Sequence, residues 1–167
     1  MSVLIYADSN NGTLTKNALE AANYGAQLAK KIGSSATAVI TGNVSDAALL
    51  GKYGVSKVLH ANNGDLDNFD PQKLAQVIAE AAKAENATVI VFAHDYSGKA
   101  VAPRLAAKLD AGLVSGAIAL PNTDAGFTVK KAVFSGKAFA EVEVLTSVKI
   151  ISVLPNSIEK IENNTTP

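Results

Sequence analysis

The chain has 167 residues, 48% of them hydrophobic and 18% charged, which is typical of one folded domain rather than of a disordered segment. Lysine plus arginine and aspartate plus glutamate each total 15, so the net charge of zero gives no attraction to nucleic acid. The absence of cysteine excludes disulfides and thiolate ligands, and no apolar run approaches the ~20 residues that cross a bilayer.

The first strand is expected at residues 3–7, an apolar run that Met1 precedes almost directly. No charged or amphipathic leader stands before it, so we expect a cytoplasmic protein. Thr13 or Thr15 is suited to cap the following helix with its side-chain oxygen. Apolar residues in that helix recur every three or four positions until Gly33, where a left-handed residue ends it.

Further strands and helices alternate up to residue 110. Ser45 is expected to cap a short helix, and Asp70 with Pro71 begins a longer one. The apolar run at 89–93 shows no polar alternation, which is typical of a strand covered on both faces. Strands are expected at 36–41, 55–61 and 89–93. Strands separated by amphipathic helices predict parallel pairing and a doubly wound α/β fold.

After Asp110 the helical pattern stops and short strands follow. We expect a strand at 113–120 and antiparallel strands between 128 and 154, joined by tight turns at 135–137 and 146–147. These strands add an edge that nothing later in the chain covers, which predicts an exposed partner surface and self-association of the isolated domain. The polar residues from Ser157 to Pro167 are expected to form a frayed tail.

Two segments carry a resemblance to a known family. SGKAVAPRLAAKLD at 97–110 and VFSGKAFAEVEV at 133–144 resemble, in this order, the amino-terminal domain of the electron transfer flavoprotein alpha subunit. The likeness extends from Val3 to about Leu154. Lys131 and Lys137 stand where the family usually has Arg and Asn, so polar contacts at those positions are not carried over.

The resemblance implies a mainly parallel three-layer α/β/α domain, like those of adenine nucleotide alpha hydrolases and universal stress proteins, at residues 1–154. Residues 155–167 would be a linker or tail, and the family's FAD-binding domain, which follows there, is absent. FAD is therefore expected in the complete protein and not on this chain. The chain end resembles a severed linker, which favours a truncated subunit over a single-domain relative.

By the same resemblance, the chain is a scaffold for the beta subunit and the flavin domain. The complete protein would carry electrons from acyl-CoA dehydrogenase-type donors, as in fatty acid beta-oxidation, toward quinone. No catalytic site, metal or membrane insertion is expected on this chain.

Four residues are candidates for partner or structural contacts. His94 ends the apolar strand; pairing with Asp95 is disfavoured because adjacent extended residues point oppositely, and a bond to backbone is favoured. Arg104 is the only arginine, so it is either a bidentate interface or structural clamp, or a surface residue paired with Asp110 or Glu85. Phe134 and Gly136 lie in the second matching segment, where the favoured interpretation is a turn glycine beside a core aromatic.

An alternative function is a single-domain AMP- or ATP-binding module of the universal stress type. The loop at the carboxyl end of the 89–93 strand lies where open α/β sheets bind ligands. Ser97 and Gly98 are its only cofactor-binding candidates, and one glycine is too few for backbone to wrap a triphosphate. His60 and His94 show no metal-ligand spacing.

Overall fold

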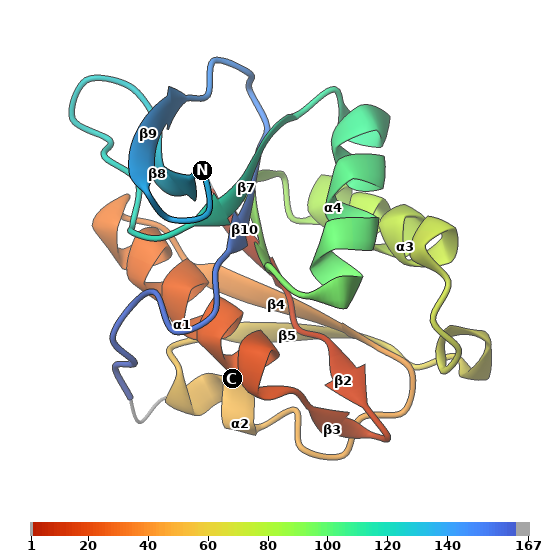
Figure 1. The fold of residues 1–167 in the computed structure, drawn as a ribbon. Helices are drawn as coiled ribbons and strands as arrows, with labels where there is room; N and C mark the ends of the chain where they lie inside the picture. Colours follow the sequence, from red (N-terminus) through yellow and green to blue (C-terminus); the bar gives the residue numbers. More distant parts are fainter. Residues whose placement is uncertain (1, 163–167) are drawn as a thin grey trace.

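The centre of the structure is an eight-stranded sheet, in which the first six strands across the sheet run parallel (Figure 1). A computed structural model describes residues 2–162. The order across the sheet is β5-β4-β1-β6-β10-β7-β8-β9. The parallel strands are β1 (Ser2–Tyr6), β4 (Ala36–Thr41), β5 (Lys57–Ala61), β6 (Ala87–Ala93), β7 (Gly112–Ala117) and β10 (Lys149–Val153). The predicted α/β fold with a mainly parallel sheet is confirmed.

Helices cover both faces of the parallel strands (Figure 1). One face packs against α1 and α2, and the other against α3 and α4. None of the helices within residues 2–162 is long and apolar enough to cross a membrane. The helices are α1 (Lys16–Lys31), α2 (Leu49–Lys52), α3 (Pro71–Ala84) and α4 (Tyr96–Leu109), with a 3₁₀ turn η1 (Gly64–Leu66) before α3.

Successive side chains of the parallel strands enter two separate cores. Ile5 and Val91 belong to the core under α1, and Leu4 and Phe92 to the core under α3 and α4. All four side chains are fully buried. Because successive residues of a strand point to opposite faces, burial on both faces requires an unbroken apolar run, as the sequence shows.

The helix ends follow local sequence signals, with one exception. The Thr15 side chain accepts a hydrogen bond from the backbone N–H three residues on (3.1 Å), and Gly33 has a φ of +66° just after α1. Asp70 caps α3, with Pro71 as its first residue. The prediction for Ser45 is wrong, because α2 begins four residues later without a side-chain cap. Its hydroxyl donates instead to a loop carbonyl (3.0 Å).

Strand β10 is central, whereas the sequence interpretation placed it among antiparallel edge strands. It runs parallel between β6 and β7, and Ile150 and Ile151 are fully buried. The predicted turn at 146–147 is therefore no hairpin, since β9 and β10 are not neighbours. The run from Lys149 to Val153 lacks the polar alternation of a half-exposed edge strand, which agrees with its buried position.

The two remaining strands of this sheet form a hairpin beyond β7, and for these the antiparallel prediction is confirmed. They are β8 (Thr128–Val133) and β9 (Ala138–Glu143), and β9 is the outer edge of the sheet. Phe134, Ser135 and Gly136 form the turn with φ values of +52°, +56° and +83°. A much smaller pair, β2 (Ser9–Asn10) and β3 (Thr13–Leu14), lies in the loop after β1.

Residues 155–162, here called the C-terminal strap, lie against α1 (Figure 1). The Asn23 side chain is fully buried and donates to the Ile161 carbonyl at 2.7 Å. The Asn156 backbone N–H donates to a carboxylate oxygen of buried Glu20 at 2.8 Å. The strap therefore supplies partners for two polar side chains that α1 buries.

The prediction of a frayed tail from Ser157 onward is therefore wrong for residues 157–162. These residues were expected to be solvated because they are polar. Their backbone carbonyls instead accept hydrogen bonds from α1 side chains, the buried Asn23 and the half-buried Gln27. The remaining predicted tail residues, 163–167, lie outside the described part of the chain.

Candidate functional site

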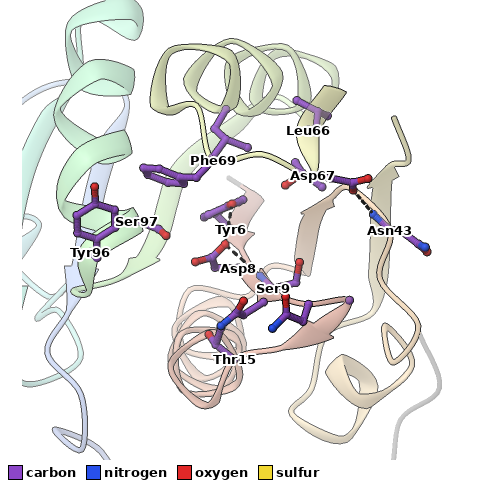
Figure 2. Close-up of a pocket in the computed structure, with 15 residues that line it drawn as sticks. Tyr6, Asp8, Ser9, Thr15, Asn43, Leu66, Asp67, Phe69, Tyr96 and Ser97 are labelled. Atoms are coloured by element: carbon purple, nitrogen blue, oxygen red, sulfur yellow. Dashed lines mark hydrogen bonds between the residues drawn. The ribbon is translucent and has the colours of Figure 1, made fainter. Parts of the chain in front are cut away.

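A cavity of about 610 Å³ opens at the carboxyl ends of β1 and β4, beside the start of α4. We call it the carboxyl-edge cleft (Figure 2). The sheet order reverses between β1 and β6, and such switch points are where open α/β sheets hold ligands. The cleft is lined by Tyr6, Asp8, Ser9, Asn10, Asn11, Gly12, Thr15, Thr41, Asn43, Leu66, Asp67, Phe69, Leu74, Tyr96 and Ser97.

Asp8 lies at the base of the cleft and is held there by two donors. The Tyr6 hydroxyl donates to its Oδ1 at 3.1 Å, and the Ser9 backbone N–H donates to the same oxygen at 3.0 Å. Burial raises the pKa of the Asp8 carboxyl; hydrogen bonds from Ser97 and Tyr6 lower it in part, and the negative charge of Asp95 raises it. Burial also raises the pKa of Tyr6, so its hydroxyl stays protonated as a donor.

The start of α4 forms one wall of the cleft. Asp95 caps the helix by accepting the Gly98 N–H at 3.0 Å, and its other oxygen accepts from the Asn17 side chain at 3.4 Å. A Cβ at Gly98 would collide with the Ala93 carbonyl oxygen, so the close approach of α4 to β6 requires glycine. Of the two predicted loop candidates, Ser97 lines the cleft, whereas Gly98 is buried beneath it.

The lining argues against the alternative function of an AMP- or ATP-binding module. The three helix N-termini beside the cleft already have side-chain caps, Thr15 for α1, Asp70 for α3 and Asp95 for α4. The described residues that line the cleft include Asp8 and Asp67 but no lysine, arginine or histidine. A triphosphate would therefore meet negative charge without any compensating cation.

The His94 ring, at the end of β6, contacts a side chain of the neighbouring strand β10. Its Nδ1 lies 2.9 Å from the Ser152 hydroxyl, which also accepts the Gly116 N–H at 3.2 Å. The expected bond from the ring to backbone is thus replaced by a bond to a side chain. Burial, followed by the charges of Lys99 and Lys131, lowers the pKa of His94, so the ring is neutral at neutral pH.

His94 belongs to no metal-binding group within residues 2–162. Asp95 is engaged as a helix cap, and no group of three histidine, aspartate or glutamate residues is arranged to hold a metal ion. His60 is exposed, and its Nε2 lies 2.7 Å from the Gly42 carbonyl oxygen.

Arg104 is exposed on α4 and makes no internal clamp. Its Nη1 donates to the Ala100 carbonyl of the same helix at 2.6 Å. The acids considered as partners lie elsewhere: Glu85 pairs with Lys57 at 2.7 Å, and Asp110 caps α4 with a left-handed backbone. A contact between Arg104 and another subunit stays a prediction.

The hairpin gathers exposed apolar side chains. Phe134 is 79% exposed, so its predicted place in the core is wrong: the turn directs it away from the sheet. Phe139 is 63% exposed, with the Lys130 ammonium 4.8 Å from the centre of its ring. Leu145, just after β9, is 85% exposed. Gly136 has the positive φ expected of a turn glycine and no contact near its missing Cβ.

Sequence reasoning missed most of the cleft. Asp8 and Asn43 are each the second residue after the end of a strand, β1 and β4, so inspecting the first two residues after every strand would have found them. Phe69 and Tyr96 come from separate segments and meet on one side of the cleft, with ring centroids 5.4 Å apart. No local signal in the sequence connects those two aromatics.

Comparison with known proteins gives one family. The family model described as "Electron transfer flavoprotein domain" matches residues 3–167. The electron transfer flavoprotein subunit alpha of Pseudomonas aeruginosa is 30% identical over 165 residues, which cover 96% of this chain and 50% of that protein. The Bacillus subtilis protein of the same name is 33% identical over 113 residues, covering 68% of this chain and 35% of its own length.

A eukaryotic relative shows the same coverage. The probable mitochondrial electron transfer flavoprotein subunit alpha of Caenorhabditis elegans is 30% identical over 164 residues, covering 95% of this chain and 46% of the relative. The chain thus spans about half the length, or less, of the curated relatives it matches.

Proposed function

Because the chain belongs to the electron transfer flavoprotein family, we propose that it is the scaffold domain of an alpha subunit, which holds the beta subunit and a flavin domain. Its role in this proposal is to bind and orient partners. The complete protein would take electrons from acyl-CoA dehydrogenase-type donors and deliver them toward quinone. A cytoplasmic location and the absence of catalysis on this chain are parts of the same proposal.

The hairpin surface is the observation that supports partner binding. We define it by Phe134, Phe139 and Leu145, whose side chains are 79%, 63% and 85% exposed. Strand β9 also leaves one row of backbone donors and acceptors unpaired at the edge of the sheet. Exposed aromatics beside an open strand edge are typical of an interface rather than of a free surface.

FAD does not fit the cleft of this chain. A pyrophosphate needs free backbone donors or cations, but the nearby helix N-termini are capped, and the described lining carries two aspartates. We therefore place FAD on the flavin domain of the proposed complete protein. The isolated chain is expected to purify colourless, and a yellow protein with stoichiometric FAD would contradict this.

Association with a beta subunit tests the proposal. The chain is co-expressed with the electron transfer flavoprotein beta subunit of the same organism and analysed by size-exclusion chromatography. We expect a 1:1 complex that the double variant Phe134→Ser/Phe139→Ser weakens by at least about tenfold, since buried aromatic anchors dominate many interfaces.

The control is Phe69→Ser, which removes a partly exposed aromatic from the carboxyl-edge cleft. It should leave the complex unchanged. Failure of the parent chain to bind the beta subunit would overturn the proposed function. Equal weakening by the hairpin variant and the control would overturn the assignment of the hairpin surface.

A further inference from the structure

We propose that the carboxyl-edge cleft binds a small organic cation, with its ammonium group between Asp8 and the aromatic pair of Phe69 and Tyr96. The cavity of about 610 Å³ is within the size range of small-molecule sites. The cleft lies beside β1 and β4, whereas the hairpin surface lies at β8 and β9, toward the other edge of the sheet. The inference is therefore independent of the proposed function.

The charge of the cleft favours a cation. Asp8 and Asp67 both line it, and no described lining residue is a lysine, arginine or histidine. Asp8 makes no ion pair within residues 2–162; its described partners are the neutral donors Tyr6, Ser9 and Ser97. A partly buried carboxylate without a cation is stabilised by any positive group that enters beside it.

The aromatic pair supplies the second recognition element. Phe69 and Tyr96 pack with ring centroids 5.4 Å apart and planes inclined by 48°, and their side chains are 42% and 79% exposed. Figure 2 shows these rings on one side of the cleft and Asp67 with Asn43 on the other, with Tyr6 and Asp8 between them. Aromatic faces attract ammonium groups, and such rings beside a carboxylate form a recurring cation site.

The other residues that line the cleft indicate which chemical groups the ligand carries besides its ammonium group. Asp67 accepts the Asn43 backbone N–H at 3.0 Å, which fixes its carboxylate at the far wall. Ser9 and Asn10 also line the cavity and carry a hydroxyl and an amide group. A short amine with hydroxyl groups, or a diamine that spans Asp8 and Asp67, matches this arrangement of charges and donors.

The test is an NMR titration of the full chain, labelled with ¹⁵N, using choline and putrescine as probes. Adenosine and AMP serve as neutral and anionic comparators. We expect saturable shifts at the cleft with at least one cation. Asp8→Asn should weaken that binding about tenfold or more, because it removes the charge and keeps the shape. Tyr96→Leu should weaken it about two- to fivefold.

The matched control is Asp124→Asn, which removes an exposed carboxylate outside the cleft and should leave the affinity unchanged. The ¹⁵N spectrum itself reports whether each variant is folded. Absence of saturable shifts with both cations, equal affinity in Asp8→Asn, or preferential binding of AMP or adenosine would each overturn the inference. None of these outcomes affects the test with the beta subunit.

Discussion

Strands β6 and β9 belong to one sheet but differ in how their side chains are held. Six of the seven residues of β6 are buried, whereas in β9 half-buried and exposed residues alternate. Helices cover β6 on both faces; β9 is an open edge with Phe139 in solvent. The difference indicates that the parallel strands carry the stability of the domain and that the hairpin presents a surface.

A pair of phenylalanine substitutions gives the largest expected contrast between these regions. Phe92→Ala in β6 should lower the free energy of unfolding by about 3–5 kcal/mol, because it leaves a cavity in a fully buried core. Phe139→Ala in β9 should cost less than about 1 kcal/mol, since only an exposed ring and its cation contact are lost. Urea denaturation followed by circular dichroism measures both. Equal losses would show that the hairpin is part of the stabilising core.

The C-terminal strap provides the next test, since it adds polar contacts with buried side chains of α1 and packs Ile158 against the core beneath that helix. Ending the chain after Leu154 should cost about 1–3 kcal/mol for each buried polar group left unpaired on Glu20 and Asn23. A chain that ends after residue 162 is the matched control and keeps those contacts. Thermal melts of the two forms should differ. Identical melting temperatures would show that the strap adds no stability.

The ionised, partly buried carboxylate of Asp8 should lower the free energy of unfolding of the domain at neutral pH. Its pKa is raised by burial, so the folded state binds a proton more tightly than the unfolded state. Protonation of Asp8 contributes its whole stabilising free energy below the ordinary aspartate pKa. That contribution is lost as the pH rises through the raised pKa of the folded state. Asp8→Asn should therefore raise the melting temperature modestly at pH 7, and the gain should shrink toward about pH 4.

Melting curves across that pH range measure the Asp8 effect. Asp124→Asn is the control; it should change stability by less than about 0.5 kcal/mol because its carboxylate is exposed. A lower melting temperature for Asp8→Asn at pH 7 would mean that the ionised carboxylate stabilises the fold.

Arg104 should give the smallest effect on stability. Arg104→Lys should change the free energy of unfolding by less than about 0.5 kcal/mol, because the guanidinium is exposed and bonds only to its own helix. Binding to the beta subunit is the second measurement, and weaker binding would assign Arg104 to an interface. A stability loss above about 1 kcal/mol would contradict the exposed position.

Much of the parallel half could be predicted because its signals are local. Thr15, Gly33 and Asp70 mark helix ends through their own side chains or backbone, and unbroken apolar runs mark strands buried on two faces. The hairpin could also be predicted, from the alternation in β9 and the glycine of its turn. Local signals were not sufficient at Ser45, because its hydroxyl donates to a loop carbonyl instead of capping a helix.

The cleft could be predicted only in part. Ser97 was identified because it follows a strand end, and Asp8 follows another in the same way. The pairing of Phe69 with Tyr96 depends on where α3 and α4 place their starts, which no spacing in the sequence encodes. Phe134 was wrongly predicted to lie in the core, because the sequence does not show whether an aromatic side chain beside a turn points toward the sheet or toward solvent.

The sequence by itself determined the fold class, the family and most element boundaries, because these depend on periodicity, caps and motifs that neighbouring residues define. Tertiary structure alone decided the place of β10 between β6 and β7, the docking of the strap on Glu20 and Asn23, and the composition of the cleft. Each of these joins segments that are distant in the chain. A later segment pairs with a strand edge or a buried polar group that the earlier segments have left without a partner. Which edge or group that is depends on how the whole molecule packs.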